Sequence, residues 1–236
     1  MTNRSLALLV LMAAIAFAVS PVIFPDFAGY RPDLFPIPQE DPPVQPAGWA
    51  FSIWGLIYAW LVLGAGFGLW KRAKDPDWQP LRVPLLVSLI VGFFWLPVAT
   101  RLPGLATLMI LMMLGGAVLA LLRAGRRDRW WQVAPVGLYA GWLTAASGAS
   151  AGIWLGGHGV LPAQAAAILS LLAVCAVALM VQSRRPGEWA YVAAVIWALV
   201  GVIAANAAQG NGLVLAVAAL GGLVLLARAW TGRAKG

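Results

Sequence analysis

Residues 49–58 read WAFSIWGLIY, and this aromatic stretch stands where a proline-rich segment gives way to a long apolar run. On a helix that advances roughly 100° per residue, Phe51, Trp54 and Tyr58 share one face, whereas Trp49 lies on another. Indole rings favour the headgroup level of a bilayer, so Trp49 is predicted to anchor the chain at the membrane interface. Lipid tails do not require the stripe formed by the other three rings. These three side chains are therefore predicted to face other helices or a cavity.

The whole chain is too apolar for a soluble protein. Its 236 residues are 62% hydrophobic and only 10% charged, with a mean hydropathy of +0.85, whereas a soluble domain carries about 25% charged residues. Crossing a bilayer core takes about 20 apolar residues. Eight stretches qualify: 6–24, 49–70, 83–100, 104–122, 130–155, 162–181, 189–205 and 212–229. The predicted fold is an all-α, polytopic transmembrane helical bundle of about eight spans.

The basic residues separate by side. Counted on alternating sides of the eight stretches, fourteen Lys and Arg fall on one side, and only Arg31 and Arg101 fall on the other. Cytoplasmic loops of membrane proteins collect such residues, so we expect a cytoplasmic (inner) membrane protein with both termini in the cytoplasm. The net charge of +8 then reflects orientation and contact with anionic headgroups, and no nucleic-acid partner is expected. The stretch 6–24 also fits a cleaved secretory signal, although its apolar run continues to Phe24.

The eight stretches carry little chemistry. No Asp, Glu, Lys or His stands near the centre of any of them, which argues against an ion channel or a proton-coupled pump. Paired carboxylates and a Ser–His–Asp set are both missing, so we expect no enzyme. His158 could ligate a haem iron or another metal from the rim, or could be a solvated loop residue. The lone Cys175 excludes a disulfide framework and a cysteine-based metal site.

A second aromatic face lies in the stretch 130–155. Tyr139, Trp142, Ala146 and Ser150 recur at a spacing of three or four residues and share one side, and Trp154 continues the stretch. Large rings alternate there with small residues. Two such faces meeting would leave a flat, ring-lined slot that suits a planar, largely apolar ligand with polar edges. The alternative is an aromatic contact between two helices without a guest.

These two segments resemble the TspO/MBR family, the tryptophan-rich sensory proteins related to the mitochondrial translocator protein. That family has a proline-rich loop followed by a Trp-x-Phe…Trp…Leu-Tyr helix, and its last helix carries Pro-Tyr-x-x-Trp-x-x-x-Ala-x-x-x-Asn. The first motif is matched in order, with a Phe-to-Trp spacing one residue shorter, by Trp49, Phe51, Trp54 and Tyr58. The second is matched by Tyr139, Trp142 and Ala146, with Leu138 replacing the proline and Ser150 replacing the asparagine.

The resemblance implies both an organisation and a function. Residues 1–157 would form the five-helix TspO-like unit with a proline-rich exported loop at 25–48, and 158–236 would form a three-helix C-terminal extension. The function implied is that of a membrane binding or sensory protein for a flat hydrophobic ligand, above all a porphyrin-type tetrapyrrole, in a pocket between 49–70 and 130–155. No cofactor is obligatory, and porphyrin or haem is the candidate ligand. The pocket residues would be Phe51, Trp54, Tyr58, Tyr139, Trp142, Ala146, Ser150 and Trp154.

Other functions and contacts stay open at this point. The chain could be a scaffold or assembly subunit of a membrane complex, or a carrier of a neutral hydrophobic solute; weak tetrapyrrole breakdown is compatible with the same pocket. The loop 25–48 holds seven prolines and is expected to be either an ordered, non-helical lid or a flexible connector. Glycines such as Gly64, Gly68 and Gly141 permit close helix approach, within one chain or at a homodimer seam. Asn206 could line a polar mouth or satisfy a helix end.

Overall fold

The computed structural model describes residues 2–25 and 29–233, and every regular element within these ranges is helical. The eight α-helices are α1 (Asn3–Ile23), α2 (Ile53–Arg72), α3 (Gln79–Ala99), α4 (Pro103–Arg123), α5 (Ala134–Gly157), α6 (Ala163–Arg184), α7 (Trp189–Gln209) and α8 (Gly212–Arg233). Short 3₁₀ turns lie at Pro32–Leu34, Gly48–Ser52 and Pro76–Trp78, and a π-helical turn at Arg129–Val133 leads into α5. The predicted all-α bundle is confirmed. Residues 26–28 of the loop and Lys235 of the basic tail lie outside the described residues.

Seven of the eight helices are long and apolar enough to cross a membrane, and α5 is the exception. It is the longest of them at 24 residues, but its sequence is rich in Gly, Ala, Ser and Thr. Most of its residues are buried against protein. A helix that faces other helices on nearly all sides does not need the apolar surface that lipid requires. The chain is thus a membrane protein in which more apolar helices surround a less apolar one.

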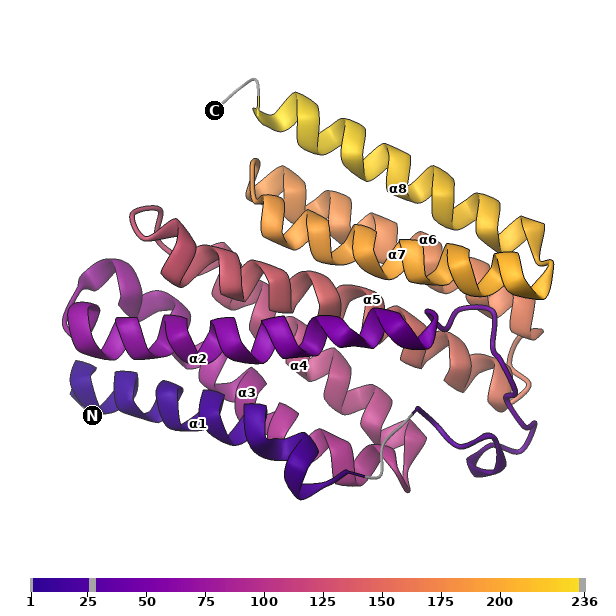
Figure 1. Cartoon of the computed structure of the whole chain (residues 1–236), viewed down its shortest axis with the longest axis horizontal. Helices are drawn as coiled ribbons and strands as arrows, with labels where there is room; N and C mark the ends of the chain where they lie inside the picture. Colours follow the sequence, from indigo (N-terminus) through magenta and orange to yellow (C-terminus); the bar gives the residue numbers. More distant parts are fainter. Residues whose placement is uncertain (1, 26–28, 234–236) are drawn as a thin grey trace.

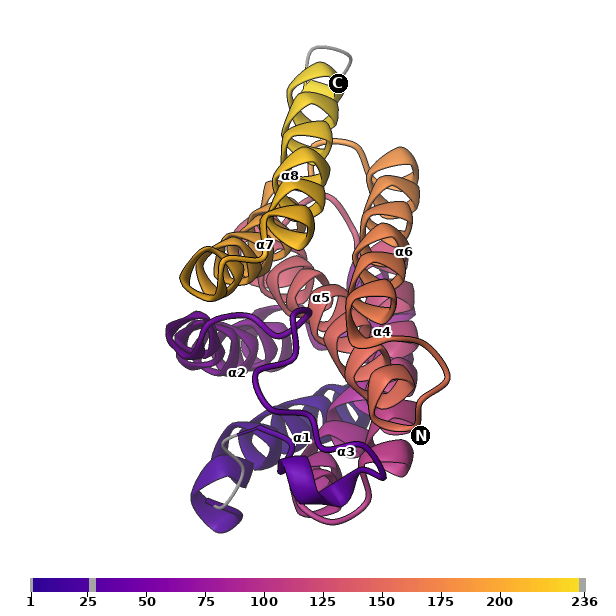
Figure 2. The same cartoon turned by 90° about the vertical axis from the view of Figure 1, so that its right-hand side faces the viewer.

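The centre of the bundle is occupied by α5 (Figures 1 and 2). It packs against α4, α6 and α7; α1 packs on α2 and α3, while α8 packs on α6 and α7. The helices alternate in direction, so α1 begins and α8 ends at the same end of the bundle (Figure 1). We call this the basic end, because the connections after α2, α4 and α6 carry most of the Lys and Arg residues. The opposite end, where residues 29–47 lie, is the loop end.

Glycines let helices approach one another closely around α5. A Cβ atom at Gly141 would lie 2.2 Å from the carbonyl oxygen of Tyr191 on α7. On α2, a Cβ at Gly64 would lie 2.4 Å from the carbonyl oxygen of Trp131. Similar conflicts with neighbours in the same chain would arise at Gly68, Gly148 and Gly152. These glycines therefore serve packing within the chain, the first of the two alternatives that the sequence left open.

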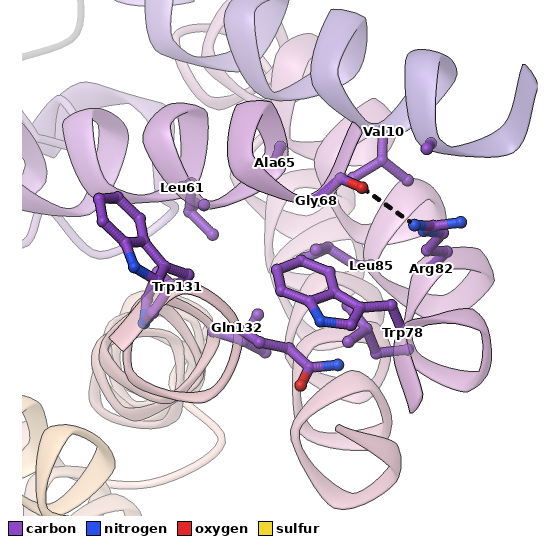
Figure 3. A pocket seen from close by; sticks show the side chains of 14 residues that line it. Val10, Leu61, Ala65, Gly68, Trp78, Arg82, Leu85, Trp131 and Gln132 are labelled. Atoms are coloured by element: carbon purple, nitrogen blue, oxygen red, sulfur yellow. Dashed lines mark hydrogen bonds between the residues drawn. The ribbon is translucent and has the colours of Figure 1, made fainter. Parts of the chain in front are cut away.

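A buried arginine ties the basic end together. Arg82 lies in the first turn of α3 and is only 2% exposed. Its guanidinium donates, over 2.8–3.4 Å, to the carbonyl oxygens of Asn3, Gly68, Arg72 and Ala73 and to Oε1 of Gln79. Figure 3 shows it beside Gly68, at the wall of a small cavity of about 20 Å³. Because the last carbonyls of α2 carry the negative end of the helix dipole, the positive charge stabilises that helix end.

Replacing Arg82 with Met should lower the melting temperature of the detergent-solubilised protein markedly. The last carbonyls of α2 would lose their donors in a buried setting, at a cost of about 3 kcal/mol. Arg101→Met is the control, because it removes the same charge from an exposed position at the loop end. Thermal unfolding followed by tryptophan fluorescence measures both variants, and equal melting temperatures would contradict the role assigned to Arg82.

Candidate functional site

The two predicted aromatic faces meet inside the bundle. The ring centroids of Trp54 on α2 and Trp142 on α5 lie 6.1 Å apart at an interplanar angle of 79°. Phe51 contacts Trp142 edge-on at 5.6 Å, and Tyr58 stacks on Trp54 at 5.1 Å. Tyr139 also lies near Trp54, with 6.4 Å between the centroids. The structure therefore brings these five predicted site residues into one aromatic group.

Phe17 of α1 closes part of the space between these faces. Its ring lies 5.7 Å from Trp54, 5.1 Å from Tyr58 and 5.6 Å from Tyr139. Phe17 is 3% exposed, and Gly92 of α3 leaves room for its ring. Trp54, Tyr58 and Tyr139 therefore pack against protein at this level. No local pattern marks Phe17 in the sequence, because a single Phe in an apolar helix resembles any lipid-facing residue.

A cavity lies on the loop side of this aromatic group. Its volume is about 60 Å³, and it is lined by Gly29, Tyr30, Gln45, Pro46, Phe51, Trp95, Ile110, Trp142, Ala145, Ala146, Ala149, Ser150 and Ile153. Four predicted site residues belong to this wall, namely Phe51, Trp142, Ala146 and Ser150. Four others, Trp54, Tyr58, Tyr139 and Trp154, do not line it. Tyr30 and Trp95 come from the loop and α3, which the sequence analysis did not connect with the site.

Trp154 lies outside the cavity. Its ring stacks on His158 at 4.5 Å, and Nδ1 of His158 lies 2.9 Å from the carbonyl oxygen of Trp154. His158 is exposed at the loop end and also contacts Phe35 at 6.0 Å. Within residues 2–25 and 29–233, no three His, Cys, Asp or Glu side chains group together as metal ligands would.

Trp49 lies at the loop end in the turn before α2. Its side chain is 47% exposed, and its ring meets Trp197 of α7 edge-on at 5.0 Å. Trp197 in turn donates from Nε1 to the carbonyl oxygen of Ala50 at 2.8 Å. A half-exposed indole at one end of a membrane helix is in keeping with the predicted interface anchor, which stays a prediction.

The polar groups of the cavity wall are few. The hydroxyl of Tyr30 bonds that of Ser150 at 2.7 Å, and Ser150 bonds Oγ1 of Thr107 at 2.8 Å. Thr107 donates to the carbonyl oxygen of Pro103 at 2.9 Å, which ends the chain of hydroxyls. Burial raises the pKa of Tyr30, and its hydrogen bond to Ser150 opposes this rise. The Tyr30 hydroxyl is thus a neutral group fixed against α5.

The indole nitrogen of Trp142 is a different case. Trp142 is 1% exposed, and its Nε1 finds no hydrogen-bond acceptor among the residues that the structure describes. A buried donor without a partner costs about 1–3 kcal/mol. Native proteins keep few such groups, and each one needs an explanation. In the wall of an apolar cavity, an unmet donor is suited to a polar atom of a ligand.

Backbone strapped across the loop end covers the cavity. Its three anchoring hydrogen bonds run from the amide of Ile37 to Gly157, from the amide of Ala47 to Gly201, and from Nδ2 of Asn206 to Pro43, at 2.8–3.0 Å. The side chains of Phe35 and Val44, which belong to this segment, are buried against the bundle. Residues 29–47 are thus an ordered, largely non-helical cover, one of the two alternatives considered for this loop. Asn206 is fully buried and holds the cover rather than lining a mouth.

No Asp, Glu, Lys, Arg or His belongs to the described wall of this cavity. A membrane bundle that encloses such an apolar space is typical of proteins that bind or sense apolar molecules. The family comparison agrees, since the model of the TSPO-like proteins matches residues 38–231, and the chain belongs to that family. No curated protein and no solved structure gave a significant match. The match extends from the loop into α8, and the division at residue 157 stays a prediction.

Replacing Asn206 with Leu should loosen the cover without changing the volume of the side chain much. The carbonyl oxygen of Pro43 would lose its donor, so the amides of residues 39–47 should exchange with deuterium at least several-fold faster. Gln209→Leu is the matched control, because Gln209 is exposed one turn further along α7. Hydrogen–deuterium exchange followed by mass spectrometry distinguishes them. Unchanged exchange in the Asn206 variant would contradict the anchoring role.

Proposed function

We propose that the chain binds a flat, largely apolar molecule with a polar edge, of the porphyrin-type tetrapyrrole class, between residues 29–47 and α5. The observation that carries the proposal is the buried Nε1 of Trp142, which lacks an acceptor. A polar atom on the edge of the ligand would accept this hydrogen bond. The hydroxyl of Ser150 stands in the same wall together with the polar side chains of Tyr30 and Gln45 from the loop, and the remaining wall is mostly apolar.

One aromatic ring would provide the flat contact surface. Phe51 and Trp142 both line the cavity and meet edge-on at an interplanar angle of 80°, so only one of the two rings can lie flat against a planar guest. Trp54 packs against Trp142, with 6.1 Å between the ring centroids. Phe17 packs in turn against Trp54 at 5.7 Å. A rigid wall of this kind suits a planar guest, since little side-chain freedom is lost on binding.

A tetrapyrrole would have to displace the cover. The cavity measures about 60 Å³, whereas sites for ligands of drug size measure about 300–1,000 Å³. A second void of about 10 Å³ borders the first and shares Pro46, Ala145 and Ala149 with it. Withdrawal of Pro46 would join the two voids along the small-residue face of α5. Even joined, the two voids would stay much smaller than a drug-sized site, so residues 29–47 would also have to move away from α5.

We propose a location in the cytoplasmic membrane for the chain and no catalytic activity. The distribution of Lys and Arg supports a cytoplasmic membrane with the basic end, and hence both termini, in the cytoplasm. The ligand would then be held at the opposite, exported end. No reaction and no obligatory cofactor are assigned to the chain. His158 is not proposed as a haem ligand, because it does not belong to the cavity wall.

Titration of the purified protein with protoporphyrin IX, followed by the absorbance of the porphyrin, tests this function. Trp142→Phe keeps a ring and removes the donor, so the affinity should fall about fivefold, the equivalent of one hydrogen bond of about 1 kcal/mol. Ala146→Leu fills the cavity and should weaken binding at least tenfold. Trp70→Phe is the control, because Trp70 is 76% exposed at the basic end. Wild-type affinity in both cavity variants would overturn the proposed site.

Failure of the wild-type protein to bind protoporphyrin would overturn the tetrapyrrole assignment itself. Two further measurements then separate the remaining functions of a membrane protein with this cavity. Flux of a neutral apolar solute into liposomes that contain the protein would indicate a carrier. Crosslinking in native membranes to one stoichiometric partner would indicate a scaffold subunit.

A further inference from the structure

A second small cavity lies at the basic end, on the far side of the bundle from the loop. Its volume is about 20 Å³, and its wall consists of Gln182, Pro186, Gly187, Glu188, Trp189, Val192, Arg228 and Ala229. The wall combines the last turn of α6, the start of α7 and the end of α8. It differs from the cavity beneath the loop because it holds a carboxylate and a guanidinium.

Gln182 is the most informative of these residues. Its side chain is 6% exposed, and Nε2 donates to the carbonyl oxygen of Leu225 on α8 at 3.1 Å. This bond fixes which end of the amide is the oxygen. Oε1 then has no donor among the residues that the structure describes. A buried amide oxygen without a donor costs about 1–3 kcal/mol, so the site favours a guest that brings N–H or O–H groups.

Glu188 places negative charge in the same wall. Its Oε1 faces Nε of Arg185 at 3.6 Å, which is too long for a hydrogen bond. The terminal nitrogens of Arg185 are already engaged, donating to the carbonyl oxygens of Ala124 and Gly125. Burial raises the pKa of Glu188, and the charges of Arg185, Arg129 and Arg126 oppose the rise. The carboxylate is therefore partly desolvated and can accept hydrogen bonds from a cationic guest.

The position of the cavity identifies the source of that guest. Trp189 belongs to its wall, and the rings of Trp60 and Trp130 lie 6.1 Å and 5.4 Å from that of Trp189. Clustered indoles at the ends of membrane helices mark the level of the lipid headgroups. Arg228 is exposed at the same level and can meet a phosphate. A molecule with a cation and a phosphate, at this depth, is a phospholipid.

The volume of the cavity decides between headgroups. A space of about 20 Å³ takes a guest about as large as one water molecule. A primary ammonium group has that size and brings three N–H donors. A trimethylammonium group is larger and brings none. We propose that this cavity binds the headgroup of an ethanolamine-type phospholipid, whose ammonium donates to Oε1 of Gln182 and to Glu188 while its phosphate meets Arg228.

Lipid retention by the full-length protein tests this site. The protein is purified into nanodiscs with equal amounts of dioleoyl phosphatidylethanolamine, phosphatidylcholine and phosphatidylglycerol, and native mass spectrometry counts the lipids that stay bound. The wild type should retain the ethanolamine lipid about tenfold over the choline lipid. Glu188→Gln and Gln182→Leu should each bring this ratio close to one. Gln209→Leu, an exposed glutamine at the loop end, should leave it unchanged.

Each other outcome overturns the proposal. Equal retention of phosphatidylethanolamine and phosphatidylcholine would mean that the cavity holds only water. Preference for phosphatidylglycerol would mean that the arginines bind an anionic lipid and the ammonium group plays no part. Displacement by soluble phosphoethanolamine at equal concentration would mean that the guest is a water-soluble amine. A melting temperature measured for each variant separates loss of the site from loss of folding. If the Gln182→Leu variant unfolds, the test rests on Glu188→Gln, which keeps the shape of the side chain.

Discussion

Close backbone contact around α5 holds the bundle together, because lipid tails provide no hydrophobic force between helices. Gly141 on α5 lets the backbone of α7 approach at Tyr191. Gly64 on α2 lets the turn before α5 approach at Trp131. Side-chain hydroxyls add directional contacts at the same interfaces, as between Thr144 and Tyr191 at 2.9 Å. A central helix made of small residues is therefore the condition for both the packing and the void beneath the loop. Larger side chains on α5 would separate the helices or fill the space.

The same constraint explains why the site divides into two parts. Towards the basic end, the ring of Phe17 lies between α2 and α5, 5.7 Å from Trp54 and 5.6 Å from Tyr139. Towards the loop end, Ala145, Ala146 and Ala149 face a strap of backbone, which follows the surface of α5 less closely than a helix with interlocking side chains. The cavity therefore lies where a helix meets a loop. Its polar groups come from both sides, with Trp142 and Ser150 on α5 and with Tyr30 and Gln45 in the loop.

The sequence predicted the helices well and the site in part. Long apolar runs predicted the eight helices, and helical spacing placed Phe51, Trp142, Ala146 and Ser150 on one face, where the structure finds them in the wall of one cavity. It could not show that Phe17 fills the space beside Trp54, since contacts between distant helices leave no local pattern. Arg82 stands just before the apolar stretch 83–100, and nothing in the sequence indicates that five acceptors from α1, α2, α3 and the α2–α3 connection surround it. Such burial depends on where helices end in space, and composition does not record that.

One contact also bears on the order in which the molecule is completed. The bond from Asn206 to Pro43 joins residues 163 positions apart. During synthesis, α1 to α5 bring together nearly all walls of the cavity long before α7 leaves the ribosome. Until then the segment over the cavity lacks two of its three attachments, since Gly201 also belongs to α7. A growing chain thus gains two of the three attachments of this segment only once α7 is in place.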